Sequence, residues 1–268
     1  MKDLNIVCPH GNDCMYVNIL KTYSECPRFI DLKNIKKCDE SKENLLDGLK
    51  NNEFTLLYQP KIDSRTNELV GLEALLRWNH PTKGFLTPDK FLDNIYMHGV
   101  MKEVDKFVIN RAKKDLQTLK DAGYNHSISV NVSVSNPVDC DLDNLEIEIT
   151  EVEMVVDREI VSKYLKKIPN KILLDDFGTG FSSLQYLQDF KIDILKIDRA
   201  FISKIPKNTI VLEAIVMLAR MLNIDLIAEG VETKEQLDWC KAHDVYVIQG
   251  YYFDKPEPLD YIIKKYLS

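Results

Sequence analysis

Two adjacent carboxylates, Asp175 and Asp176, directly follow the aliphatic residues 172–174 in the stretch KILLDDFGTG. The aliphatic run predicts a buried strand, and burying a carboxylate is costly unless a cation or hydrogen-bond donors compensate its charge. Polar side chains of catalytic type also lie in, or directly after, seven other apolar runs. The full set is Gln59, Glu73, Asn131, Glu148, Glu151, Asp175, Asp176, Lys196, Asp198, Glu229, Glu232 and Gln249.

If the ends of these strands meet, the acids repel one another, and cations or protons must relieve the repulsion. The candidate ligands are carboxylates and one amide, without Cys or His, which favours the hard ions Mg²⁺ or Mn²⁺. Asp175 and Asp176 are adjacent, so one of them could bridge two ions. Two such ions can activate a water and stabilise a leaving oxygen in phosphodiester hydrolysis. The residues predict a metal-dependent phosphohydrolase and leave open other barrel enzymes with acidic metal sites, such as enolase-type lyases.

The elements that must position these residues follow from the hydrophobic pattern. Eight short apolar runs have the composition of strands, and helix-like segments separate several of them. Gly123 is a predicted C-terminal helix cap, and Thr233 with Gln236 forms a predicted N-terminal capping box. The predicted helices cover 100–123, 209–223 and 233–244, and the predicted strands cover 54–62, 69–78, 128–133, 145–150, 171–177, 193–198, 225–231 and 245–253.

The repeated alternation of strands and helices predicts an α/β fold, and specifically a (β/α)8 TIM-like barrel. Catalytic groups of such barrels lie at the carboxyl ends of the strands, which is where the polar residues occur. A doubly wound open sheet is the alternative. No G-x-G-x-x-G follows an early strand, which disfavours a dinucleotide-binding domain.

Eight motifs occur in a fixed order between about residues 44 and 260: YQPKID, EALLRWNHP, NVS, EITE, DDFGTGFSSL, LKID, AEGVET and QGYYF. The second of them contains Glu73-Ala74-Leu75. With these motifs the chain resembles the EAL-domain family of cyclic di-GMP phosphodiesterases. The resemblance implies a barrel of the EAL type that hydrolyses the bacterial second messenger cyclic di-GMP to linear pGpG, using two Mg²⁺ or Mn²⁺ ions.

The resemblance also implies which residues hold the ions and act on the water. Glu229 would be the general base, Lys196 would donate a hydrogen bond to the attacking water, and Asp198 would orient solvent or metal. Asp175 would bridge the two ions. The implied metal ligands are Glu73, Asn131, Glu148, Asp175, Asp176 and Glu229.

Further residues are implied to contact the substrate or support the site. Gln59, Arg77 and Gln249 match substrate-contacting positions. Arg77 suits a phosphate or a guanine edge, because its planar guanidinium can donate two hydrogen bonds at once. Glu151 would anchor the loop after the fifth strand, and Glu232 would support the same region.

The family resemblance leaves two functions to be distinguished. The first is an active phosphodiesterase, which the intact acids favour. The alternative is a noncatalytic EAL domain that binds cyclic di-GMP or a protein partner as a regulator. A homodimer is expected in either case, with the segment 181–193 as its interface.

The composition of the chain argues against two classes of partner, nucleic-acid polymers and membranes. The formal net charge of −7 argues against binding to a nucleic-acid polymer, which requires a basic surface. No apolar run approaches the roughly 18 residues that span a bilayer, and the first residues lack the apolar region of a secretory signal. The chain is therefore expected to be cytoplasmic and without a membrane span.

Residues 1–40 are predicted to be a cysteine-containing N-terminal extension, and residues 41–268 the barrel. The cysteines of the extension lack the closely paired spacing of zinc sites, which favours unlinked thiols and leaves metal or redox chemistry as the alternative. Cys140 and Cys240 are expected to be reduced structural thiols. The cysteines of the extension are Cys8, Cys14, Cys26 and Cys38.

The connection between Asn131 and Glu148 departs from the family pattern. It is short, and it contains a proline and several Asp and Asn residues. A crossover between parallel strands needs about a dozen residues or more and usually contains a helix. We expect this third crossover to be a loop or stub that lacks its full helix, which could weaken the metal site.

Overall fold

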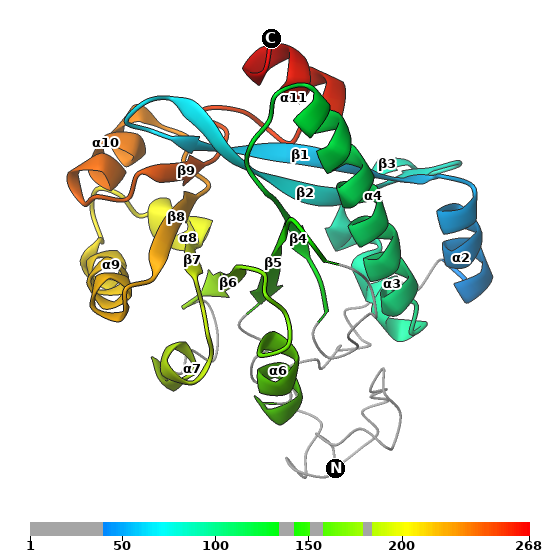
Figure 1. Ribbon diagram of the computed structural model, residues 1–268, viewed down its shortest axis with the longest axis horizontal. Coiled ribbons are helices and arrows are strands. Elements are labelled where there is room, and N and C mark those ends of the chain that lie inside the picture. Colours follow the sequence, from blue (N-terminus) through cyan, green and yellow to red (C-terminus); the bar gives the residue numbers. More distant parts are fainter. Residues whose placement is uncertain (1–39, 134–141, 151–157, 179–183) are drawn as a thin grey trace. The chain divides into compact units, whose positions relative to one another are not determined.

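A computed structural model describes residues 40–133, 142–150, 158–178 and 184–268 (Figure 1). The described residues belong to two compact units. The first contains the chain up to Thr55 together with Leu76–Phe107, and the second contains Leu56–Leu75 and Val108–Ser268. The predicted boundary after residue 40 stays a prediction, because residues 1–39 lie outside the described part of the chain.

Within the described residues, eight strands form a closed barrel. These strands are β1 (Phe54–Asp63), β2 (Glu68–His80), β4 (Ile128–Asn131), β5 (Leu145–Thr150), β6 (Ile172–Phe177), β7 (Ile194–Ile197), β8 (Asp225–Glu229) and β9 (Val247–Gln249). β2 pairs in parallel with β4, and each strand from β4 to β9 pairs in parallel with the next. β1 pairs with both β9 and β2 and so closes the ring. The predicted TIM-like barrel is confirmed, and the open-sheet alternative is wrong.

The direction of β1 departs from a fully parallel barrel. β1 runs antiparallel to β9, with Ile62 opposite Ile248. Only residues 64–67 connect β1 with β2. So short a turn cannot contain the crossover that parallel neighbours require, and the first two strands therefore form a hairpin.

Helices follow several of the barrel strands (Figure 1). They are α4 (Met101–Asp121), α6 (Arg158–Leu165), α7 (Leu184–Asp189), α8 (Arg199–Ile202), α9 (Ile210–Leu222), α10 (Lys234–Ala242) and α11 (Leu259–Tyr266). α9 lies against β8 and buries Leu212, Ile215 and Val216. No helix in the described part of the chain is both long and apolar enough to cross a membrane.

Both predicted helix caps are confirmed. The Thr233 side chain accepts a hydrogen bond from the Gln236 N–H, and the Gln236 side chain accepts one from the Thr233 N–H, which is the predicted capping box of α10. Beyond the end of α4, Gly123 has a φ of +96° and donates its N–H to the Lys120 carbonyl at 2.9 Å. Glycine adopts such a φ at no steric cost, so it suits this position.

Aromatic packing holds the first unit together. Phe54 stacks on Trp78 with ring centroids 4.8 Å apart, and Phe91 meets Trp78 edge-on at 5.8 Å. His80 Nε2 lies 2.9 Å from Glu40 Oε1, which attaches the first described residue to β2. The further elements of this unit are α2 (Lys42–Lys50), β3 (Gly84–Leu86), the 3₁₀ helix η3 (Pro88–Lys90) and α3 (Leu92–Met97).

The third crossover joins β4 to β5. Its described residues, 132–133 and 142–144, are not helical. Residues 134–141 lie outside the described part of the chain, so the predicted absence of a full helix stays a prediction for them. At the far end of the crossover, Asn170 Nδ2 donates hydrogen bonds to the carbonyls of Leu142 and Leu145 at 2.7 and 2.8 Å, which fixes the start of β5.

Only one cysteine lies among the described residues. Cys240 is a free, fully buried thiol on α10, as expected from the sequence. Cys140 and the four cysteines of the N-terminal extension lie outside those residues, and the expectations about them stay predictions.

Candidate active site

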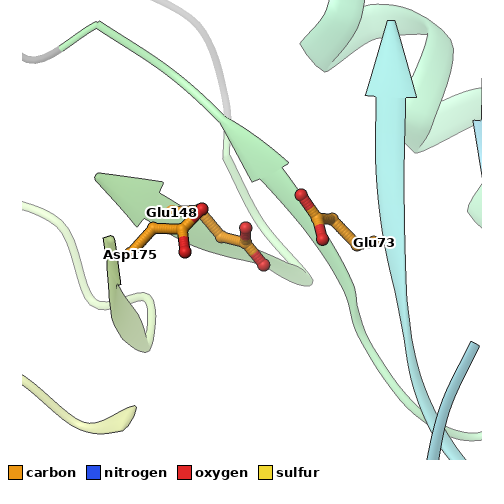
Figure 2. Close-up of side chains that lie close together, drawn as sticks. All are labelled: Glu73, Glu148 and Asp175. Atoms are coloured by element: carbon orange, nitrogen blue, oxygen red, sulfur yellow. The ribbon is translucent and has the colours of Figure 1, made fainter. Parts of the chain in front are cut away.

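Three of the predicted metal ligands point toward one another inside the barrel (Figure 2). Glu73 comes from β2, Glu148 from β5 and Asp175 from β6. One carboxylate oxygen of each lies within 4.8 Å of the other two. Glu73 and Glu148 are only 5% and 1% exposed, so their charges are removed from water. The barrel therefore gathers acids that are far apart in the sequence.

The register of the strands explains this convergence. Asn131 is aligned with Glu148 across β4 and β5, and Glu229 is aligned with Gln249 across β8 and β9. Aligned residues of neighbouring strands project to the same face of a sheet. Consistent with this, Asn131 Nδ2 donates to Glu73 Oε1 at 3.0 Å.

A β-bulge accounts for the adjacent acids of the DDFGTG motif. Between Leu174 and Phe177, β6 has two residues where β7 has one. The two residues are Asp175 and Asp176, and the β7 residue is Lys196. Asp176 has a φ of +57° and donates its N–H to Asp175 Oδ1 at 2.9 Å. Bulges of this kind redirect side chains and are frequent beside active sites.

Lys196 lies at the centre of the acids and is fully buried. Its Nζ is 2.6 Å from both Glu148 Oε2 and Glu229 Oε1. The same atom is 3.2 Å from Asp175 Oδ2 and 3.4 Å from Glu73 Oε2. The structure thus places the predicted catalytic pair, Lys196 and Glu229, in direct contact and adds Glu229 to the cluster.

A second buried ammonium, that of Lys61 on β1, was not predicted. Lys61 Nζ donates to Ser129 Oγ at 2.6 Å and to Glu148 Oε1 at 3.0 Å. The signal in the sequence was a lysine inside the otherwise uncharged strand run 54–62. A lysine in a strand is more often exposed, so its inward direction becomes evident only from the closed barrel.

The charges of the site do not balance. Four carboxylates, those of Glu73, Glu148, Asp175 and Glu229, surround Lys196. Lys61 contacts one of them, Glu148, and also lies 3.9 Å from Glu146, so the acids outnumber the two ammonium groups. Burial opposes ionisation of Glu148, yet its two lysine partners hold its pKa below the ordinary value. Burial and neighbouring acids raise the pKa of Glu73 and, well above its usual range, that of Glu229. The excess of acids therefore opposes ionisation of Glu73 and Glu229 most strongly.

Two predicted substrate contacts, Gln59 and Gln249, adjoin the cluster. Gln249 Nε2 donates to Glu73 Oε2 at 2.5 Å and to Gln59 Oε1 at 3.1 Å. Gln59 in turn donates to the Asp254 carbonyl at 3.3 Å. Gln249 Oε1 is buried and has no hydrogen-bond partner among the described residues.

Two other predicted residues do not contact the cluster in this structure. The Asp198 side chain accepts the Ala200 N–H at 2.7 Å and caps the N-terminus of α8. Glu232 pairs with Arg199 at 2.9 Å near the surface. Each therefore has a structural partner outside the cluster, Asp198 on the helix that it caps and Glu232 on α8.

The remaining predicted residues differ in how far the structure describes them. Asp176 has an exposed side chain at the bulge. Arg77 is 8% exposed, belongs to the first unit and donates to the Leu76 carbonyl at 2.8 Å. Its contact with substrate stays a prediction. Glu151 lies outside the described residues.

The donor set fits a divalent cation. Glu73, Glu148 and Asp175 supply carboxylate oxygens within reach of one position, and hard oxygen donors are what Mg²⁺ and Mn²⁺ prefer. The acids also outnumber the lysines. A divalent cation would supply positive charge to this cluster of acids.

A family model described as "EAL domain" matches residues 42–256. The chain belongs to the EAL domain family. The Glu73-Ala74-Leu75 sequence lies on β2, so the glutamate that begins the EAL motif is one of the three converging carboxylates.

Curated relatives of this EAL domain carry activity names. The cyclic di-GMP phosphodiesterase NbdA of Pseudomonas aeruginosa is 35% identical over 242 residues, which is 82% of this chain and 31% of NbdA. The probable cyclic di-GMP phosphodiesterase PdeG of Escherichia coli is 34% identical, over 85% of this chain and 49% of PdeG. The chain thus spans less than half the length of each relative.

Solved EAL structures share the fold. The phosphodiesterase PaMucR, in a complex with c-di-GMP, is 30% identical with a TM-score of 0.75, covering 82% of this chain and 98% of that one. An EAL domain protein from Listeria monocytogenes is 33% identical with a TM-score of 0.71, and the match covers 85% of this chain and 98% of the Listeria chain.

Proposed function

We propose that this EAL domain hydrolyses cyclic di-GMP to linear pGpG and so removes a bacterial second messenger. The names of its curated relatives support this substrate. The observation that carries the proposal is the convergence of buried acids around Lys196. Such a site combines oxygen ligands for metal ions with a fixed cation, a combination suited to metal-assisted hydrolysis of a phosphodiester.

Two divalent cations, Mg²⁺ or Mn²⁺, belong to the proposal. When bound, they would lower the pKa of a water and neutralise charge on the phosphate. The acids of β2, β5 and β6 would hold the first, and the bulge of β6 with the end of β8 would hold the second. The proposed ligands are Glu73, Asn131, Glu148, Asp175, Asp176 and Glu229.

Lys196 and Glu229 are the proposed catalytic groups. The surrounding carboxylates keep the pKa of Lys196 well above its ordinary value, against the effect of burial, so Lys196 would remain a hydrogen-bond donor to the attacking water. Glu229 has a raised pKa, which makes it a better proton acceptor than an ordinary glutamate. We assign the removal of the water proton to Glu229, and the orientation of solvent to Asp198.

The substrate would lie against the Gln59–Gln249 pair. Gln249 Oε1 lacks a partner among the described residues, and a buried acceptor without a donor is unfavourable. A hydroxyl or amino group of the dinucleotide would supply that donor. We propose Arg77 as a phosphate or guanine contact, and Glu151 and Glu232 as supports of the neighbouring loops.

A turnover assay tests the proposal. Purified full-length chain is incubated with Mn²⁺ or Mg²⁺ and cyclic di-GMP, and the products are separated by chromatography. We expect linear pGpG from the wild type and its loss in Glu73→Ala and Glu229→Ala. Glu68→Ala is the matched control, because Glu68 lies on the same strand as Glu73 but is exposed.

The outcomes separate the candidate functions. Binding of cyclic di-GMP without turnover by folded wild-type protein would contradict the proposal and support the noncatalytic regulator. Hydrolysis of other phosphodiesters, with none of cyclic di-GMP, would support a different barrel hydrolase.

The homodimer and the cytoplasmic location stay predictions. The expected interface, 181–193, lies partly outside the described residues. Support for an association surface comes from α9, where Ile210, Met217 and Met221 are 82%, 63% and 79% exposed. These residues are spaced to lie on one face of the helix. Sedimentation velocity of the wild type over a range of concentrations would detect the dimer.

A further inference from the structure

Lys61 is a buried charge that the proposed function does not use. It lies on β1 and is 2% exposed. Its ammonium group donates to Ser129 Oγ at 2.6 Å and to Glu148 Oε1 at 3.0 Å, and Glu146 Oε2 is 3.9 Å away. Removing a lysine from water is expensive unless its donors are satisfied. Lys61 meets that condition through groups on β4 and β5.

The barrel has a space that fits the stem of Lys61. Gly71 on β2 faces it, and a Cβ atom at Gly71 would lie 3.1 Å from Lys61 Cδ. Ser129, which accepts a hydrogen bond from Lys61, is fully buried, and its Oγ donates in turn to the Leu72 carbonyl at 3.3 Å. A small residue on the neighbouring strand β2 and a hydroxyl on β4 therefore determine where the ammonium group lies.

Each of the two lysines contacts a different oxygen of the Glu148 carboxylate. Lys61 contacts Oε1, whereas Lys196 contacts Oε2 at 2.6 Å. The side chain of Glu148 has no exposed surface, so water cannot replace either partner. With Oε1 held by Lys61, the orientation of the whole carboxylate is fixed.

We infer that Lys61 is a positioning residue of the metal site, which holds Glu148 through one oxygen so that its carboxylate faces Glu73 and Asp175. This inference rests on the proposed metal-dependent function. Hydrogen bonds to a ligating carboxylate orient it, and their loss commonly weakens metal binding about 10- to 100-fold. Lys61 would act through Glu148, with which it makes its contact in the site.

The test measures the affinity of the metal-free full chain for Mn²⁺. Electron paramagnetic resonance reports the concentration of free Mn²⁺ during the titration. Lys61→Met keeps the length of the stem and removes the donor, and we expect it to bind Mn²⁺ at least about 10-fold more weakly than the wild type. Lys234→Met is the control for the loss of one positive charge. Lys234 is exposed and forms an ion pair with Asp238 on the same helix, so its variant should match the wild type.

A second variant keeps the charge and moves it. Gly71→Ala places a methyl group against the Lys61 stem, and we expect weaker Mn²⁺ binding although the lysine remains. Circular dichroism and thermal unfolding establish that each variant is folded. A folded Lys61→Met protein with wild-type Mn²⁺ affinity overturns the inference. If Lys61→Met does not fold, unchanged affinity in Gly71→Ala overturns it.

The wild type separates this inference from the proposed function. Wild-type protein that binds Mn²⁺ but does not hydrolyse cyclic di-GMP contradicts the proposed reaction, while the variants still decide the role of Lys61. Wild-type protein that binds neither Mn²⁺ nor Mg²⁺ overturns both.

Discussion

Lys196 Nζ lies 2.6 Å from Glu229 Oε1, and both groups belong to a cluster in which one of the carboxylates, Glu148, also contacts the buried Lys61. Lys196 contacts all four carboxylates of the cluster. The ammonium group therefore has two functions: it limits the repulsion among the acids, and it fixes the proposed general base.

Replacement of Lys196 by methionine should separate these functions. We expect loss of turnover by at least about 100-fold, because a positioned proton donor or acceptor contributes about that much. The metal-free protein should lose about 3 kcal/mol of stability, since buried acids lose their partner. Urea unfolding in EDTA measures the second effect, and saturating Mn²⁺ should recover part of it. Unchanged stability in EDTA would show that the acids do not depend on Lys196.

The raised pKa values of Glu73 and Glu229 predict how the metal-free protein responds to pH. A carboxyl group with a higher pKa in the folded state binds more protons when folded, so its stabilising contribution disappears as the pH rises above the ordinary value of 4.5. We expect the free energy of unfolding in EDTA to fall as the pH rises from about 5. Glu229→Gln should flatten this slope. A stability that rises over the same range would contradict the assignment.

The hydroxyl of Tyr58 should stabilise the attachment of α4 to β1. It donates to Asp115 Oδ2 at 2.6 Å, and both residues are buried. Tyr58→Phe should cost about 2 kcal/mol, because the hydrogen bond is to a charged group. Tyr124→Phe is the comparison, since that hydroxyl donates to a neutral carbonyl, that of Ser127, and should cost about 1 kcal/mol. Chemical denaturation measures both, and equal losses would contradict the ranking.

Gly250 follows Gln249 and cannot accept a side chain. A Cβ atom there would lie 2.2 Å from the Val231 carbonyl oxygen. Gly250→Ala should therefore destabilise the protein by about 3 kcal/mol and displace Gln249. Gly123→Ala, where no atom lies within 4 Å and only the positive φ opposes alanine, should cost about 1 kcal/mol. Thermal unfolding measures both losses, and equal losses in the two variants would contradict the close contact at Gly250.

Cys240 should be unreactive in the folded protein. Burial raises the pKa of its thiol to about 12, and the thiolate is the form that alkylating reagents attack. Iodoacetamide at about pH 8 should leave the Cys240 peptide unmodified in native protein and modify it in urea, as mass spectrometry can measure. Equal labelling in both states would mean that α10 opens readily.

The sequence alone predicted much of this barrel. Alternating strand and helix patterns are local properties, so the eight barrel strands, α4 and the capping box of α10 could be placed from the residues near them. The polar ends of the strands also predicted that Glu73, Glu148 and Asp175 would meet. Their meeting follows from parallel strands whose carboxyl ends lie at one edge.

Only the tertiary structure decided which atoms make contact. The antiparallel direction of β1 depends on pairing between distant segments, and so does the bulge, in which Asp175 and Asp176 of β6 lie opposite the single residue Lys196 of β7. The same holds for Lys61, whose partners lie on β4 and β5. A side chain on a strand faces inward or outward according to register, and register is fixed by closure of the whole barrel. The residue types of the site can therefore be read from the local sequence. The partner of each charged group is determined by the tertiary structure.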